Sequence, residues 1–136
     1  MDTNVVVSAM RSPKGAPAAL LVAARDGKLT PLANVALALE YEATCRLPEH
    51  RLAAGLDLGE VAIFVEAVIA MAEPVESHFT WRPQLRDPGD ELVLEAAVNG
   101  HADAIVTFNS RDFATVPQRF GIALLTPAEA LRRLRS

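Results

Sequence analysis

The chain has 136 residues, 51% hydrophobic and 22% charged, which suits one domain with one core and excludes wholesale disorder. Its one cysteine, Cys45, excludes an internal disulfide and a zinc knuckle. The formal net charge of −4 taken alone argues against a nucleic-acid ligand, although divalent cations bound by carboxylates would reverse the local field.

Helical and strand-like patterns alternate along the chain. Apolar residues at helical spacing between capping and stop residues predict helices, and short apolar runs predict strands. In chain order we expect a strand end or helix start at Val5–Val7, a helix over Ala16–Asp26 stopped by Gly27, a strand over Leu29–Leu32, and a helix from the cap Asn34 to about Arg46 ended by Pro48. Next we expect a helix from Asp57 or Gly59 stopped by Pro74, a strand over 75–79, a turn over Asp87–Asp90, and a helix over Glu91–Asn99 ended by Gly100. The last predicted elements are strands over Ala104–Thr107 and Ile122–Leu125 and a helix capped by Thr126 and opened by Pro127. The alternation predicts an α/β fold over residues 1–136, a three-layer α/β/α sandwich with a mostly parallel central sheet.

The N-terminal residues lack the charged and apolar regions of a secretory signal. The most apolar stretch, Val61–Ala72, is shorter than a membrane span and carries Glu66. We therefore expect a cytoplasmic protein with no membrane contact.

Four acidic residues are candidates for a site: Asp2, Glu40, Asp90 and Asp112. Asp2, Asp90 and Asp112 stand near predicted strand ends or helix starts, where active sites of parallel α/β folds lie, and Glu40 lies mid-helix beside a mainly apolar face. Clustered carboxylates repel one another unless cations occupy the site, and Mg²⁺ or Mn²⁺ prefers such oxygen ligands. Each acid also has a structural reading: Asp90 as a helix cap, Asp112 and Asp2 as exposed residues, and Glu40 as a helix-surface residue beside Glu42.

The same residues carry a family resemblance over nearly the whole chain. The segments are Asp2-Thr3-Asn4-Val5-Val6-Val7-Ser8-Ala9, Glu40-Tyr41-Glu42, Asp87-Pro88-Gly89-Asp90-Glu91, residues 102–113 and Leu125-Thr126-Pro127. In this order they resemble the motifs of PIN domains, and within that family the VapC-like toxin components of toxin–antitoxin systems. The resemblance implies a PIN-like fold, cleavage of RNA with Mg²⁺ or Mn²⁺, a homodimer and a cognate antitoxin protein.

The resemblance also implies a role for each acid. Asp2, Glu40 and Asp90 are expected as catalytic metal ligands, with Asp112 as the fourth acid and Asn109 as a further oxygen ligand. For binding RNA we expect the hydroxyl residues Thr3 and Thr107, which otherwise cap backbone, and the basic residues Arg11, Lys14 and Arg82, which otherwise are solvated.

Two features depart from the family pattern. Asn109 stands where many members have Asp, so it adds no negative charge. Asp2 directly follows Met1, whereas the family has a short apolar strand before this Asp, near the middle of the sheet. Without that strand, neighbouring strand edges are unpaired; either the start lies upstream, or the chain was trimmed, or the sheet is rearranged.

The sequence leaves three alternatives to a ribonuclease. One is a PIN-fold protein with weak or no catalysis that acts as a binding module. Another is a related metal-dependent DNA nuclease. A receiver-like domain is disfavoured, because it needs a Lys after a late strand and the lysines are Lys14 and Lys28.

Overall fold

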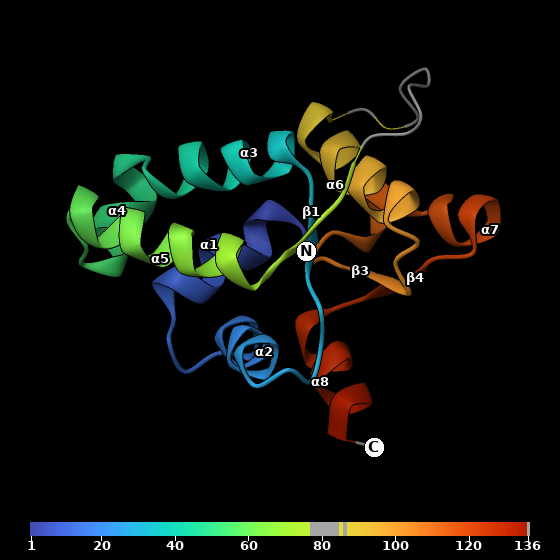
Figure 1. Ribbon diagram of the computed structural model, residues 1–136, viewed down its shortest axis with the longest axis horizontal. Coiled ribbons are helices and arrows are strands. Elements are labelled where there is room, and N and C mark those ends of the chain that lie inside the picture. Colours follow the sequence, from blue (N-terminus) through green and yellow to red (C-terminus); the bar gives the residue numbers. More distant parts are fainter. Residues whose placement is uncertain (77–84, 86, 136) are drawn as a thin grey trace.

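The computed structural model describes residues 1–76, 85 and 87–135 (Figure 1). The elements of these residues are α1 (Thr3–Arg11), α2 (Ala16–Arg25), β1 (Leu32–Ala33), α3 (Val35–Cys45), α4 (Pro48–Ala54), α5 (Leu58–Met71), β2 (Glu73–Pro74), α6 (Pro88–Asn99), β3 (Ala104–Val106), the 3₁₀ helix η1 (Ser110–Phe113), α7 (Val116–Phe120), β4 (Ala123–Leu125) and α8 (Pro127–Arg135). The chain is thus a mixed α/β protein, mostly helical, with short parallel strands.

The capping residues that the sequence indicates begin their helices. The side-chain oxygen of Asn34 accepts a hydrogen bond from the backbone N–H of Leu37 at 2.8 Å at the start of α3. Asp57 and Glu60 form a reciprocal capping box at the start of α5. Thr126 and Glu129 exchange the same pair of hydrogen bonds at α8.

Val5–Val7 lie inside α1, so of the two predicted alternatives the helix start is confirmed. Two other predicted boundaries are wrong. Pro48 opens α4, since a proline needs no N–H partner in the first turn, and so it starts a helix that the sequence reading missed. Helix α6 begins at Pro88 rather than Glu91, because Asp87 is its cap.

The strand positions shift as well. Strand β1 covers Leu32–Ala33 instead of Leu29–Leu32. Strand β2 covers Glu73–Pro74, so of the strand expected over 75–79 the first two residues are not strand, and the others lie outside the described residues. The shifts are small, and the predicted elements keep their order, to which the structure adds α4, η1 and α7.

The described strands form two separate parallel pairs rather than one sheet. Strand β1 pairs with β2, and β3 pairs with β4 in the register Ala104 with Ala123 and Val106 with Leu125. The chain begins between these pairs, near β1 and β3 (Figure 1). Because the strands are short and share few hydrogen bonds, packing between the helices provides most of the stability of the fold.

The core is built around α1. Val5, Val6 and Val7 are at most 4% exposed, so consecutive residues of this helix are buried. Such burial requires neighbours on several sides, and α1 contacts α2, α3 and α4. The core continues through Leu94 of α6 and Ile105 of β3.

Within the described residues, none of the helices has the length and apolar character needed to cross a membrane.

Candidate active site

Asp2 is buried at the start of α1, where a hydroxyl group holds its carboxylate. Asp2 is only 4% exposed. Its Oδ2 accepts a hydrogen bond from Thr107 Oγ1 at 2.7 Å, and its backbone N–H donates to Val106 O at 2.9 Å. Asp2 is the helix cap of α1 by position, but its side chain makes no capping hydrogen bond. The carboxylate is therefore held by Thr107, directly after β3, and does not cap α1.

Glu40 is held in a similar way from the same end of α1. Thr3 Oγ1 donates to Glu40 Oε2 at 2.8 Å, which ties α3 to the residue after Asp2. The other oxygen, Oε1, lies against α6: a Cβ added to Gly89 would come within 2.6 Å of it. The absence of a side chain at Gly89 thus lets Glu40 approach the N-terminus of α6.

That N-terminus carries further carboxylates. Asp87 caps α6, its Oδ1 accepting from the backbone N–H of Gly89 at 2.7 Å, and Asp90 and Glu91 lie in the first turn. The positive end of the helix dipole favours carboxylates at this position. The local peptide therefore stabilises part of the negative charge that the site gathers.

Asp90 shows how crowded the carboxylates are. The pKa of Asp90 is raised to about 6, first by burial and then by the negative charges of Asp2, Asp87, Asp112 and Glu40 in that order. Four of the acids that the sequence singled out thus affect one another electrostatically, although they come from distant parts of the chain.

Asp112 and Asn109 lie on the exposed rim. Both belong to the segment after β3, Asn109 just before η1 and Asp112 within it. The backbone N–H of Asn109 donates to Thr107 Oγ1 at 3.0 Å, and Asp112 N–H donates to Asn109 O at 3.0 Å. Through Thr107, this rim is connected to Asp2.

Tyr41 is a site residue that the sequence reading missed. Its hydroxyl donates to the carbonyl oxygen of Met1, directly before Asp2. Burial raises the pKa of the Tyr41 hydroxyl, and the charges of Asp2 and Glu40 add to this. The signal was available, since Tyr41 follows Glu40 in the chain and is the one tyrosine in it.

The two predicted RNA-binding cations in the described residues, Arg11 and Lys14, lie away from the acids. Arg11 ends α1, about 14 Å along the helix axis from Asp2, and its guanidinium lies 3.2 Å from His50 Nδ1. Lys14 lines a cavity between α2 and α8 at the other end of the molecule. Arg82 lies outside the described residues. The hydroxyls of Thr3 and Thr107 donate to Glu40 and Asp2 instead of facing outward for a substrate.

The donor set suits a divalent cation such as Mg²⁺ or Mn²⁺. In the described ranges, no three His, Cys, Asp or Glu side chains converge closely enough to form a ready metal group. The chemistry still fits: the donors are carboxylates, burial and then their mutual repulsion raise the pKa of Asp90, and Gly89 leaves room for Glu40 beside α6. A cation among them would offset the repulsion.

The sequence profile of the PIN domain matches residues 1–111, which is most of the chain. The chain therefore belongs to the PIN domain family, whose members are generally nucleases and typically use divalent metal ions. No curated protein and no solved structure gives a significant match.

Proposed function

We propose that this protein is a Mg²⁺- or Mn²⁺-dependent endoribonuclease. The observation that carries the proposal is the gathering of acids at the start of α6, where Glu40 Oε1 lies against Gly89. The pKa of Asp90 supports it, because burial and then the charges of Asp2, Asp87, Asp112 and Glu40 raise it. In a PIN domain such a point is where phosphodiester hydrolysis is expected. The proposal includes a three-layer α/β/α arrangement, with helices on both sides of the strands.

Each acid has a defined part in this proposal. Asp2, Glu40 and Asp90 would hold the cation, which when bound supplies an activated water and neutralises charge on the phosphate. Asp112 and Asn109 would complete the ligand set from the rim. Thr107 and Thr3 act as positioning residues, because their hydroxyls fix the carboxylates of Asp2 and Glu40.

The test is cleavage of a mixed RNA substrate with Mn²⁺ or Mg²⁺. Asp2→Asn and Asp90→Asn should each lower the rate at least a hundredfold, as should EDTA. Glu42→Gln is a matched control, because Glu42 lies on the same helix and pairs with Arg46 at 3.6 Å instead of facing the acids. Activity that survives EDTA and both Asp variants would contradict the proposal. Single-stranded and duplex DNA in the same assay would show whether the protein is instead a DNA nuclease.

We also propose that the protein is the toxin of a toxin–antitoxin pair and acts in the cytoplasm as a homodimer. Apolar side chains support protein partners: Val35 and Leu39 on α3 are 77% and 59% exposed, and Ile63 on α5 is 69% exposed. Expression should arrest growth, and Asp90→Asn should abolish the arrest. Arrest by the inactive variant would contradict a toxic ribonuclease.

A binding module without catalysis is the second candidate. It is favoured by Asn109, a neutral residue in the acidic site, and by the absence of a ready metal group in the described part of the chain. Such a protein should bind Mn²⁺ only in the millimolar range and leave RNA intact, while remaining folded.

A further inference from the structure

A cavity lies between α2 and α8, at the end of the molecule opposite the start of α6 (Figure 1). Its volume is about 370 Å³, within the range of about 300–1,000 Å³ that is usual for small-molecule sites. Apolar side chains of both helices form its wall: Ala19, Val22 and Ala23 from α2, and Leu131 and Leu134 from α8. Val22 is 45% exposed, so part of this wall is open to solvent. We refer to this feature as the α2–α8 cavity.

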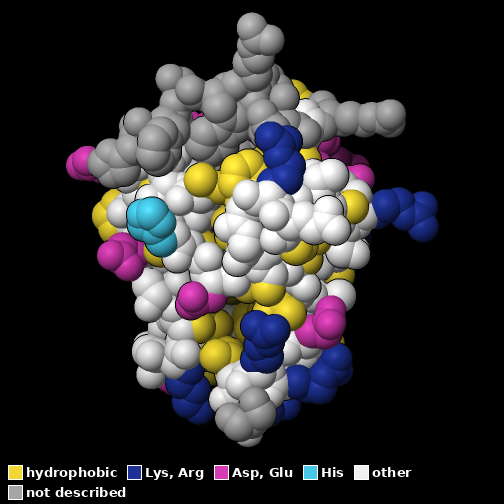
Figure 2. Space-filling model, turned by 90° about the vertical axis from the view of Figure 1, so that its right-hand side faces the viewer, with side chains coloured by type: hydrophobic (Ala, Val, Ile, Leu, Met, Phe, Trp, Pro, Cys, Tyr) yellow, Lys and Arg dark blue, Asp and Glu magenta, His cyan; other side chains and the backbone are white. Residues whose placement is uncertain are grey.

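Three exposed cations stand around the α2–α8 cavity: Lys14, Lys28 and Arg135. Asp26 also lines it, but its Oδ1 lies 3.3 Å from Nε of Arg25, which compensates its charge. Figure 2 shows Lys and Arg side chains gathered at the lower end of the molecule. The surroundings of the cavity are therefore positively charged, although the whole chain carries a net charge of −4.

Helix stability does not explain all of these cations. Arg135 lies in the last turn of α8 and Lys28 follows the end of α2, where the helix dipole favours a positive charge. Lys14 directly precedes Gly15, the N-cap of α2, where the dipole disfavours one. An anionic ligand at the cavity would offset this unfavourable placement.

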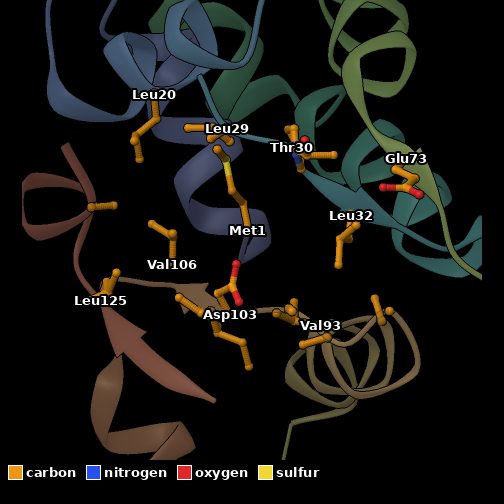
Figure 3. Close-up of a pocket in the computed structure, with 18 of the residues that line it drawn as sticks. Met1, Leu20, Leu29, Thr30, Leu32, Glu73, Val93, Asp103, Val106 and Leu125 are labelled. Atoms are coloured by element: carbon orange, nitrogen blue, oxygen red, sulfur yellow. The ribbon is translucent and has the colours of Figure 1, made fainter. Parts of the chain in front are cut away.

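Helix α8 connects the cavity to the candidate active site. Leu125 at the end of β4 lies beside Val106 of β3 (Figure 3). The carbonyl oxygen of Leu125 accepts from the N–H of Thr107, whose hydroxyl holds Asp2. Helix α8 begins two residues later and runs about 12 Å along its axis to Arg135. A ligand that reaches from the cavity to the acids must therefore be a chain rather than a small molecule.

We propose that the α2–α8 cavity binds one nucleotide of a single-stranded RNA, with the base against the apolar wall and the flanking phosphates at Lys14, Lys28 and Arg135. RNA as the ligand rests on the proposed ribonuclease function. A bare phosphate ion would not use the wall, and an apolar molecule would not use the cations, whereas a nucleotide has both a charged part and a flat base. A base within a duplex is paired and stacked and cannot enter the cavity, so the ligand is a single strand.

The first test is fluorescence anisotropy with a labelled twelve-nucleotide RNA in EDTA, where no metal is bound at the acids. We expect micromolar binding, and binding of the single strand at least tenfold tighter than of an RNA duplex with the same number of phosphates. Charge alone predicts the reverse, because a duplex has the higher charge density. No binding in the micromolar range, or a duplex that binds as tightly, would overturn the proposal.

Variants of the three cations locate the phosphates. Lys14→Gln, Lys28→Gln and Arg135→Gln should each weaken RNA binding at least threefold. Each should also lower the dependence of log Kd on log salt concentration by about 0.7, the effect of one phosphate contact to a single strand. Arg46→Gln is the matched control, because Arg46 pairs with Glu42 at 3.6 Å beside α3. Equal effects of all four changes would overturn the proposal.

Val22→Asp tests the site of the base. It adds a carboxylate to the apolar wall at a half-exposed position, so the fold should persist while RNA binding weakens at least tenfold. Leu52→Asp on α4, where Leu52 is 66% exposed, changes the net charge by the same amount. Equal weakening by the two changes would overturn the proposal, because net charge alone would then explain it.

Two further ligands separate RNA from other occupants. A peptide of twelve glutamates and free AMP should each bind at least tenfold more weakly than the RNA. Tighter binding of the peptide would assign the cavity to an acidic protein segment, and tighter binding of AMP would assign it to a free nucleotide; either would overturn the proposal. All these measurements are made without metal. RNA that binds here but is not cleaved with Mn²⁺ would contradict only the proposed nuclease function, and RNA that is cleaved but does not bind here would contradict only this inference.

Discussion

Thr107 connects three parts of the candidate site through a single hydroxyl. It is fully buried, donates to Asp2 Oδ2 and accepts from the backbone N–H of Asn109. The sequence places Thr107 at the end of a predicted strand, but a strand end alone does not indicate which carboxylate the hydroxyl meets. That contact joins residues 105 positions apart and depends on the packing of α1 on β3.

Thr107→Val should therefore disturb both stability and the site. Valine has nearly the same shape, so the change removes the hydroxyl without leaving a cavity. We expect the free energy of unfolding to fall by about 1–2 kcal/mol, because the buried Asp2 carboxylate loses a donor. Denaturant unfolding measures this. Thr44→Val on the outer part of α3 is a control; equal stability of Thr107→Val and the parent would contradict the assigned hydrogen bond.

Asp90 predicts an unusual pH dependence for the metal-free protein. Its pKa of about 6 lies above the usual aspartate value of 3.8, so the folded state holds more protons than the unfolded state between about pH 4 and 6. Stability therefore falls as the pH rises through this window. Asp90→Asn should stabilise the metal-free protein at pH 7 by on the order of 1 kcal/mol, a value reduced by solvent screening, and by much less at pH 4. Thermal melts in EDTA at both pH values test this; a variant no more stable than the parent at pH 7 would contradict it.

At the scale of elements, α6 contributes both to the site and to the packing. Its first turn carries Asp90 beside Glu40, and its C-terminus packs on β1 at Gly100. The sequence indicates the helix and its Gly stop, but misplaces its start by three residues. A Pro-Gly pair after Asp reads as a turn, whereas Asp87 uses its side chain to cap a helix that begins at the proline.

Gly89→Ala should separate function from stability. The new Cβ would lie 2.6 Å from Glu40 Oε1, so this flexible carboxylate must move away from α6. Alanine also favours helix over glycine by about 0.5–1 kcal/mol, so Tm should hold or rise. Affinity for Mn²⁺ should fall at least tenfold, as measured by calorimetry. Unchanged affinity would mean that Glu40 has no part in binding the cation.

Gly100→Ala should have the opposite outcome. A Cβ there would lie 2.7 Å from Leu32 Cδ1 and 2.9 Å from both Ala96 O and Val75 Cγ2, so α6 must shift against β1 and β2. We expect a loss of about 1–3 kcal/mol in the free energy of unfolding. Gly59→Ala is the matched control, because a Cβ there meets only Asp57 Oδ1, at 3.3 Å. Equal effects of the two changes would contradict close packing at Gly100.

At the scale of the whole molecule, the sequence predicts the order of the elements and the candidate acids better than it predicts how the strands pair. Caps, glycine stops and apolar periodicity act within a few residues, so Asn34, Asp57 and Thr126 could be assigned from the sequence. Strand pairing depends on residues far apart. The one central sheet expected from the alternation is replaced, in the described residues, by two strand pairs with a cavity between them.

The charge of the whole molecule is also clearer with the structure. The net charge of −4 argued weakly against a nucleic-acid ligand. Several of the negative charges act on Asp90, where a divalent cation would compensate them. The cations Arg11 and Lys14 lie elsewhere, so an approach of RNA to the acids depends on other residues.

The central claim is that Asp2, Glu40 and Asp90 together hold a divalent cation. Its most direct test is Mn²⁺ titration of the parent, Asp90→Asn, Glu40→Gln and the control Glu42→Gln at pH 7.5, with free Mn²⁺ measured by electron paramagnetic resonance. We predict micromolar binding by the parent and Glu42→Gln, and affinity at least tenfold weaker for each of the other variants. Equal affinity of all four proteins would contradict the claim.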